Sequence, residues 1–511
     1  MTTEIILEGH FDAADQAADE FPLLPFEVPP GIARLHVRYQ VSHSLSGNKV
    51  GWQEGNIVDI GLFDPRGAEF LTAKGFRGWS GTARQAFTIA ADEATPGYLP
   101  GPVQPGTWHV VLGLYQLAPE GCDYHVVVTL EEQGGRRQEA GSGKREAERH
   151  RGRDRGTEDS PRWYRGDLHA HTWHSDGSAP LADLVAAARA QGLDFAAVTE
   201  HNTISHLPLV LSRVEGPILS QVEGPILSQV EGPVLTPDLL LIPGVEITTY
   251  HGHANVWPVD WPAEGFVEFR CWNDEQMAQV REAVRARGVL FSVNHPKDDG
   301  PPWEFGDLFD PDCIEVWGSP WFISNYQSLA VWDAQLRQGK RITGVGGSDK
   351  HQGRFTGELS WYEVGNPCTW VYASALSVEA IVAGLRAGHV FISEGPTGPR
   401  LELTVEAVHK HGGQRAAMGD ELSLPAGASL RLRCRVQGGA GNVLRLVSAQ
   451  EIREAEIASD DFTHECQVIV TGDTYWRAEV IEPPEAPLDE EPAALMVKAL
   501  GNPIYVEATL A

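Results

Sequence analysis

Paired cysteines, an apolar leader and long hydrophobic runs are all missing from this 511-residue sequence. The six cysteines lie far apart and form no CxxC pair, which indicates isolated thiols in a reducing compartment. No run of about 18 apolar residues occurs, and the acidic start MTTEIILEGHFD lacks the charged-then-apolar pattern of a secretory leader. The sequence therefore predicts a soluble, cytoplasmic protein that spans no membrane.

Positive charge is scarce as well. The chain has 40 Lys and Arg against 70 Asp and Glu, a formal net charge of −30. Such an excess of negative charge disfavours general binding to nucleic-acid backbone or to anionic membranes, so we expect a small-molecule substrate and no stable nucleic-acid partner. The GxSxG motif of serine hydrolases and the GxxxxGKS phosphate loop are also absent, which excludes two common catalytic designs.

Hydrophobic patterning divides the chain into four regions. Residues 1–131 and 396–511 contain short alternating runs separated by Gly and Pro, which is typical of antiparallel β-sandwich domains. Residues 132–161 have few large apolar side chains and mixed charges, which predicts a disordered linker. In residues 162–395 strand and helix patterns alternate, which favours an α/β fold with a parallel sheet and enough units to close a barrel.

A short repeat interrupts this third region. Residues 214–237 contain VEGPILSQ twice and then VEGPVLTP, and the Gly-Pro in each unit prevents a helix. Three units of this length are too few for a solenoid. We interpret the segment as an exposed insertion near the rim of the barrel. A neutral expansion of the tandem repeat is favoured over a lid that covers the substrate.

Polar residues follow the predicted strands of residues 162–395. His169 and His171 are spaced so that both side chains of a strand end point the same way, a common arrangement for holding a metal. Because barrels bring the C-terminal ends of their strands to one mouth, we expect the whole set to converge there. Mixed nitrogen and carboxylate donors suit zinc, manganese or iron. The set is His169, His171, Asp176, Glu200, His201, Glu246, His253, His295, Asp349 and His351.

The motifs that contain these residues resemble those of the polymerase and histidinol phosphatase (PHP) family of metal-dependent hydrolases. DLHAHT, SDG, TEHNT, PGVE, GHANVW, NHP and GGSDKH occur in the family's order. The resemblance implies a distorted (β/α)7 barrel, flanked here by the two β-sandwich domains. TEHNT, TTYHGHANVW and GPTGPRLEL look most similar to the branch that includes carbamate (carbaryl) hydrolases.

The resemblance also implies how two or three divalent ions would be held. The first ion would bind His169, His171, Glu246 and Asp349, and Glu246 would bridge to a second ion on His253 and His295. The third would bind Asp176, His201 and His351, more weakly because Asp176 stands where some relatives have histidine. Glu200 would orient a ligand from behind, and the catalytic residues would be Glu246, Asp349, His201 and His351.

Such a cluster predicts a hydrolase. Divalent ions that share a carboxylate lower the pKa of a bound water toward neutrality, which supplies hydroxide at cellular pH. We expect cleavage of a small phosphomonoester or phosphodiester, with Lys297, Lys350 and Arg354 as rim cations for the phosphate, although solvated loop charge is an equal interpretation. Two alternatives stay open. One is a carboxyl-ester or carbamate hydrolase with an apolar wall of tryptophans, and the other is a metal-binding module without catalysis.

Overall fold

The computed structural model describes residues 2–42, 55–72, 74–132, 161–211, 239–259, 268–352, 362–408, 413–484, 488 and 492–509. Residues 133–160 of the predicted linker, the whole 214–237 insertion and Arg354 lie outside these ranges, so the predictions made for them stay predictions. Within the described ranges, none of the helices is long and apolar enough to cross a membrane. All six cysteines are free, and five of them are buried.

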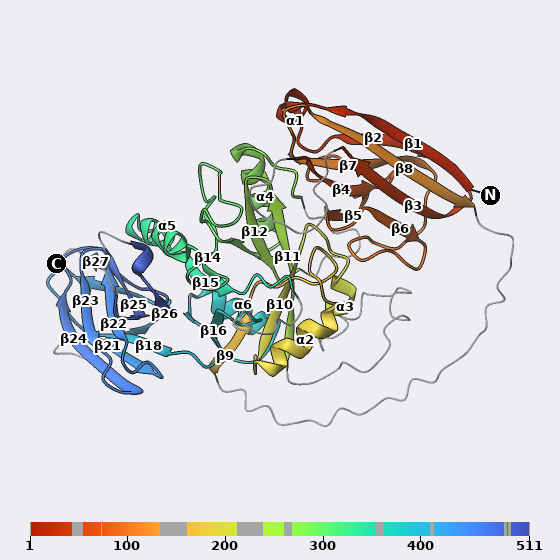
Figure 1. Cartoon of the computed structure of the whole chain (residues 1–511). Helices are drawn as coiled ribbons and strands as arrows, with labels where there is room; N and C mark the ends of the chain where they lie inside the picture. The colour runs from red at the N-terminus through yellow and green to blue at the C-terminus, as the bar shows by residue number, and fades with distance from the viewer. Residues whose placement is uncertain are drawn as a thin grey trace, which may run out of the picture.

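The first part of the chain forms an antiparallel sandwich, here called the N-terminal sandwich and coloured red to orange in Figure 1. Its two sheets have the strand orders β1-β8-β3-β6 and β2-β7-β4-β5, and inward-facing residues such as Val37 and Leu112 share one core. The elements are β1 (Thr2–Phe11), α1 (Ala13–Ala18), β2 (Leu23–Val28), β3 (Ile32–Val41), β4 (Ile57–Phe63), β5 (Phe76–Gly81), β6 (Ala86–Ala90), β7 (Gly106–Gln116) and β8 (Cys122–Glu132).

A mixed sheet occupies the centre of the molecule, with the strand order β15-β14-β13-β12-β11-β10-β9-β16-β17. Helices α3, α4, α5 and α6 lie against β11, β13, β14 and β16. The elements are β9 (Arg162–Asp167), α2 (Leu181–Ala190), β10 (Phe195–His201), α3 (Leu207–Leu211), β11 (Leu240–Thr249), β12 (Gly252–Trp257), α4 (Asp274–Ala286), β13 (Leu290–Val293), β14 (Cys313–Gly318), α5 (Asn325–Arg337), β15 (Thr343–Gly347), β16 (Cys368–Ala373), α6 (Val378–Arg386) and β17 (Val390–Ser393).

The predicted (β/α)7 barrel requires correction. Strands β9, β10 and β11 run parallel, as do β13, β14 and β15, but β12 is antiparallel to both of its neighbours and β16 is antiparallel to β9 and β17. Only Tyr250 and His251 separate β11 from β12, whereas a parallel crossover needs about a dozen residues, so these strands can only form a hairpin. The described part of the chain is a strand-rich α/β fold without seven regular strand–helix units.

Helix α2 shows how the sequence sets the local structure of this region. Its buried residues Leu181, Leu184, Val185 and Ala188 recur at helical spacing and face the sheet. Gly192 follows the helix with φ of +69°, a left-handed conformation that glycine adopts without strain and that commonly ends a helix. The chain can therefore turn at once into β10, which delivers the Glu200–His201 pair.

The last part of the chain forms a second sandwich, here called the C-terminal sandwich. One of its sheets continues the central sheet, because β17 pairs antiparallel with β26. Asn502 fixes this junction, since its side chain exchanges hydrogen bonds with the backbone of Gly344 in β15 and donates to Val390 O. The elements are β18 (Arg400–Ala407), β19 (Arg415–Ala417), β20 (Glu421–Pro425), β21 (Ser429–Gln437), β22 (Val443–Ser448), β23 (Ile452–Glu456), β24 (Asp461–Ile469), β25 (Thr474–Ile481), a 3₁₀ turn (Pro492–Ala494), β26 (Val497–Gly501) and β27 (Ile504–Thr509).

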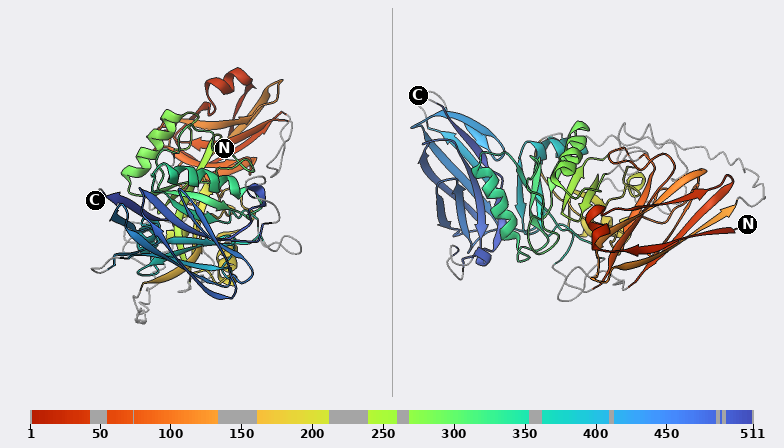
Figure 2. Two further views of the ribbon diagram at one scale, coloured as in Figure 1. Left: turned by 90° about the vertical axis from the view of Figure 1, so that its left-hand side faces the viewer. Right: turned by 90° about the horizontal axis from the view of Figure 1, so that it is seen from above.

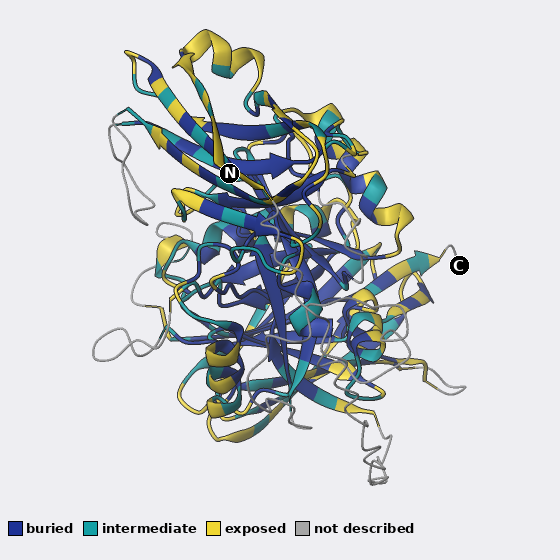
Figure 3. Ribbon diagram, turned by 90° about the vertical axis from the view of Figure 1, so that its right-hand side faces the viewer, coloured by how far each residue is buried: buried dark blue, intermediate teal, exposed yellow. Residues whose placement is uncertain are grey.

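The three parts follow one another along the molecule, with the central sheet in the middle (Figure 2). The N-terminal sandwich packs on the central part through aromatic side chains, such as Trp79 against Phe269 with ring centroids 4.7 Å apart. Phe21 likewise stacks on Tyr250 at 5.1 Å. Buried residues run continuously through the central strands, and exposed ones gather on the outer edges (Figure 3). The domain boundaries expected from the sequence remain predictions.

Candidate metal centre

Backbone pairing beyond the ends of β9 and β15 builds the centre. The amide of Asp349 donates to His169 O at 2.8 Å, and the amide of His171 donates to Lys350 O at 2.9 Å. Ala170 and Lys350 form a parallel bridge between these two extensions. Two stretches that are far apart in the sequence therefore run side by side, and their alternate side chains point into the same space.

The first group of donors lies close together. His169 Nε2 lies 3.3 Å from Glu246 Oε1 and 3.3 Å from Asp349 Oδ1. His171 Nε2 lies 3.2 Å from the same Asp349 oxygen and 3.5 Å from Glu246 Oε2. Metal–ligand bonds of about 2.1 Å in a tetrahedron place neighbouring donor atoms about 3.4 Å apart. These four side chains lie close together, and Glu246 faces the two histidines through different oxygens; that the four share the first ion stays a prediction.

Glu246, in the C-terminal half of β11, is the hub of the cluster. Besides His169 and His171, its carboxylate has three more imidazoles within 3.5 Å, those of His201, His253 and His295. Asn294 Nδ2 donates to Glu246 Oε1 at 2.8 Å and helps fix the carboxylate. A buried carboxylate with ring nitrogens on every side can bridge two ions. In the second predicted set, His253 Nδ1 and His295 Nε2 both lie within 3.5 Å of Glu246 Oε1.

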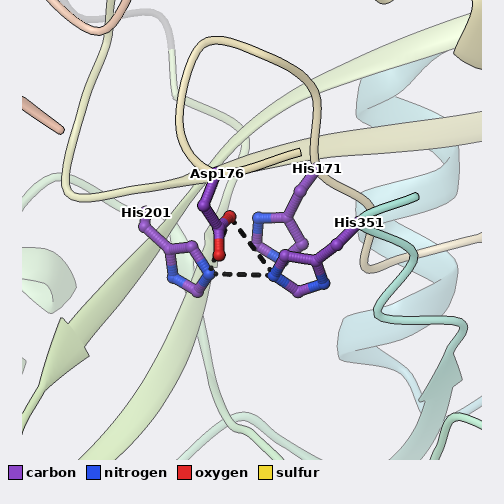
Figure 4. A group of neighbouring side chains, drawn as sticks. All are labelled: His171, Asp176, His201 and His351. Atoms are coloured by element: carbon purple, nitrogen blue, oxygen red, sulfur yellow. Dashed lines mark hydrogen bonds and ion pairs between the residues drawn. The ribbon is translucent and has the colours of Figure 1, made fainter. Parts of the chain in front are cut away.

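The third group comes from three separate segments and is drawn in Figure 4. Asp176 Oδ1 lies 3.4 Å from His351 Nε2 and 3.5 Å from His201 Nε2, and these two nitrogens are 3.1 Å apart. His171 lies close enough to join them, so it stands between the first and third groups. Asp176, His201 and His351 together provide one carboxylate and two imidazoles for a further ion.

Solvent access differs sharply across the cluster. The side chains of His169, His171 and Glu246 are at most 1% exposed, whereas Asp176 is 37% and Asp349 is 25% exposed. The third group therefore forms the open face of the centre. A substrate would approach from the side of Asp176, His201 and His351.

Unsatisfied polar atoms at the core of the cluster show that it fits metal ions. His169 Nε2, both ring nitrogens of His171 and Glu246 Oε2 are buried without a hydrogen-bond partner among the described residues. Burying such atoms unpaired costs free energy, so native structures rarely retain them. Divalent ions would satisfy His169 Nε2, Glu246 Oε2 and one ring nitrogen of His171. The residues that would hold the ions are His169, His171, Asp176, His201, Glu246, His253, His295, Asp349 and His351.

The protonation states suit metal binding too. Burial, reinforced by His351 and His201, lowers the pKa of His171 to about 3, so this imidazole is neutral and its nitrogen lone pair is available. Burial alone would raise the pKa of Glu246, but the neighbouring His169, His201 and His253 outweigh it and hold that pKa well below the ordinary value. Burial alone would also raise the pKa of Asp349, but the neighbouring His169 and His351 outweigh it and hold that pKa well below the ordinary value.

Left-handed backbone occurs at three residues of the centre. Asp349 has φ of +52°, Asn202 of +50° and His295 of +26°. Non-glycine residues rarely adopt such angles, and their cost is usually accepted at functional sites where a side chain must take a fixed direction. Each of these residues is a predicted ligand or follows one.

Two buried acids that position ligands were missed in the sequence. Glu315 of β14 lies 3.1 Å from His169 Nδ1 and accepts the amide of His295 at 3.1 Å. Asp167, at the end of β9, accepts amides from His169, Ser348 and Gly365 at 2.8 to 3.0 Å. A carboxylate on the second nitrogen of a metal-binding histidine fixes its tautomer and orientation. An acid within an otherwise apolar strand pattern was the only available signal for Glu315.

Glu200 acts on a loop rather than on an imidazole. Its carboxylate accepts the Oγ1 and amide of Thr172 and, at 2.5 Å, the Oγ of Ser175, next to Asp176. Burial raises the pKa of Glu200 to about 7, while the bonds from Ser175 and Thr172 oppose that shift. Glu200 therefore holds the chain segment that carries Asp176.

The cations predicted for the rim have protein partners. Lys297 is buried, and its Nζ donates to Gly318 O at 2.8 Å and to Asn325 Oδ1 at 3.0 Å. Burial lowers the pKa of Lys297 to about 8. Lys350 is also buried and donates to Tyr362 O. These contacts favour a structural role for both lysines over contact with a phosphate.

The tryptophans considered for an apolar wall are mostly interior. Trp257, Trp317 and Trp321 are at most 5% exposed, and the rings of Trp317 and Trp321 pack edge to face. The indole of Trp257 donates to Leu168 O. These three tryptophans belong to the core.

Comparison with solved structures finds distant neighbours, two of which are described here. One is a two-domain protein from Bacteroides vulgatus that contains a predicted PHP-like metal-dependent phosphoesterase, with a TM-score of 0.35 and 17% identity over 68% of this chain and 95% of the other. The second is a candidate metal-dependent phosphoesterase from Bifidobacterium adolescentis, with a TM-score of 0.23 and 16% identity over 36% and 87% of the two chains. No protein-family model and no curated protein matches the sequence. Neither neighbour is described as a carbamate hydrolase.

Proposed function

We propose that this chain is a PHP-type, metal-dependent hydrolase that cleaves a phosphomonoester or phosphodiester of a small substrate. The observation that carries the proposal is the Glu246 carboxylate with five imidazoles within 3.5 Å. Asp349 and Asp176 extend this hub into three adjacent cation positions. When bound there, divalent ions would supply an activated water at neutral pH and neutralise charge on the substrate oxygens.

The proposed roles of the residues follow from their positions. Glu246 joins the three groups from a fully buried place, while Asp349, His201 and His351 form part of the open face. His201 would be charged without an ion, because Asp176 and Glu246 overcome its burial and raise its pKa to about 9. We assign the catalytic function to these four residues, within a catalytic unit proposed to span residues 162–395.

Phosphoryl transfer suits three adjacent cations better than acyl transfer does. Charge in the phosphoryl transition state is spread over several oxygens, and two ions about 4 Å apart can stabilise the attacking and the leaving oxygen together. Acyl transfer develops its charge on a single oxygen. Of the four tryptophans considered for an apolar wall, Trp257, Trp317 and Trp321 are buried and Trp303 is partly buried, which weighs against a carbamate substrate.

Turnover measurements test this function directly. Full-length protein supplied with Mn²⁺ or Zn²⁺ is expected to hydrolyse aryl phosphate monoesters or diesters, and the same protein after chelation is the control. Aryl acetates and aryl carbamates belong in the same panel. Absence of phosphate-ester turnover above the chelated control, or preference for carbamates, would count against the proposal.

A further inference from the structure

The N-terminal sandwich contacts the segment that presents Asp176 to the open cation position. We call residues 172–178 the Asp176 loop. Arg84 lies between β5 and β6 of the sandwich, and its Nη1 donates to Ser175 O at 3.0 Å while its Nη2 donates to Trp173 O. One guanidinium therefore holds two carbonyls of the chain just before Asp176.

A second contact shows that this docking is close. The amide of Gly97 in the sandwich donates to Ser205 Oγ at 3.0 Å, and that hydroxyl lies 2.8 Å from His174 Nδ1 in the loop. Thr203 Oγ1 donates to Gly97 O at 2.8 Å. Gly97 has φ of +99°, and a Cβ there would lie 3.0 Å from His174 O. The sandwich thus fits so closely against the loop that a larger residue at position 97 would be crowded.

The central sheet holds the Asp176 loop at its two ends. Thr172 donates to Glu200, and the amide of Ser178 donates to His351 O at 2.7 Å. The middle of the loop is held from two sides. Glu200 of the central sheet accepts the Oγ of Ser175 at 2.5 Å, and Arg84 of the sandwich donates to the carbonyls of Ser175 and Trp173. The carboxylate of Asp176 is the most exposed of the carboxylates in the cluster at 37%, so the backbone that bears it largely determines where it lies.

We propose that Arg84 is a positioning residue, which holds the Asp176 loop so that the Asp176 carboxylate meets His201 and His351. The N-terminal sandwich would then set the affinity of the open cation position from outside the central sheet. A guanidinium is suited to this task because its planar, fixed donors can hold two acceptors at once, whereas an ammonium acts as a point charge. The inference rests on the metal centre of the proposed function but not on its substrate.

Metal titration of Arg84→Ala in the full-length chain tests the proposal. The most weakly held Mn²⁺ or Zn²⁺ is expected to bind about 10- to 100-fold more weakly, the range seen when an outer partner of a metal ligand is lost. The ions held by the buried groups should keep their affinity. Arg84→Lys should recover part of the loss, and Arg38→Ala, a change of an exposed arginine on the same sandwich, should have no effect.

A double-mutant cycle separates positioning from general stabilisation. Asp176→Asn removes the carboxylate itself, so adding Arg84→Ala to it should cause no further loss of metal affinity. If Arg84 only stabilised the fold, the two losses would add. Hydrogen exchange in metal-free protein gives an independent readout, and amides of residues 172–178 are expected to exchange faster in Arg84→Ala than in Arg38→Ala.

The outcomes distinguish this inference from the proposed function. Wild-type protein that binds its ions but hydrolyses no phosphate ester would contradict the proposed function. Metal titration and hydrogen exchange of the Arg84→Ala variant would still test the role of Arg84. Arg84→Ala protein with unchanged titration and unchanged exchange of the loop would overturn the inference. Wild-type protein that binds no metal would overturn both.

Discussion

His171 Nε2 lies 3.2 Å from Asp349 Oδ1, although one residue follows β9 and the other follows β15. The pairing of residues 169–171 with 349–351 fixes this relationship through the backbone. Donor atoms that are already in place need little further ordering when a ligand arrives. The centre is therefore expected to bind its ions tightly and to tolerate few changes.

Asp349→Asn should remove most of the activity while the fold persists. The amide keeps the shape of the side chain but loses the charge that faces His169 and His171. We expect at least about a 100-fold loss of turnover together with weaker metal binding. Asp183→Asn, at an exposed site of α2, is the matched control. Loss of soluble protein in place of loss of activity would point to a structural role for the ions.

Glu315→Gln tests the acid behind His169. Its carboxylate lies 3.1 Å from His169 Nδ1, and a neutral amide would polarise and orient that ring less strongly. We expect about 10- to 100-fold weaker metal affinity, measured by competition with a chelator. Glu379→Gln on the exposed side of α6 serves as the comparison. Equal metal affinities in the two variants would show that Glu315 does not support metal binding by His169.

Stability should fall as the medium becomes acidic, in part because of His206. Burial, together with nearby His174, lowers the pKa of His206 to about 3, while in unfolded chains histidine has a pKa of about 6.5. The unfolded state therefore binds the extra proton first, and the stability contribution of neutral His206 is lost as pH falls from about 6.5 toward 3. His206→Asn should show a flatter decline of Tm between pH 7 and pH 5 than wild type. Parallel curves would contradict this cause.

Removal of metal should lower the thermal stability. Ions that bind the folded state alone stabilise it by about 4 kcal/mol when their concentration is a thousandfold above Kd. Thermal unfolding with a chelator and with excess Mn²⁺ should therefore differ by several degrees. Glu246→Gln should shrink that difference, because it weakens the hub that the five imidazoles share. The same Tm in both buffers for wild-type protein would argue against an ion-binding fold.

Much of the centre could be predicted because its residues stand at strand ends with recognisable neighbours. The spacing of His169 and His171, and the turn residues around Glu246 and Asp349, are local features that the sequence displays. Glu315 could not be found in this way, because it sits within the buried strand CIEVWG and only the folded sheet brings it to His169.

The distorted (β/α)7 barrel and the two described rim lysines show what local patterns leave open. The polar residues at the end of β11 look like those of a strand followed by a crossover, but two residues are too few for one and the chain turns back as a hairpin. Lys297 follows a ligand motif and carries a charge, yet Gly318 and Asn325 bind its ammonium inside the protein. Such partners depend on distant segments, which no local pattern reveals.

Elemental analysis of the purified full-length protein is the most direct test of the metal centre. Protein expressed with added manganese or zinc and freed of loose ions is expected to retain about two to three divalent ions per chain. The Glu246→Ala variant, measured beside it, should lose most of them while remaining folded. Wild-type protein without bound divalent metal, or a Glu246→Ala variant that keeps the full complement, would contradict the account.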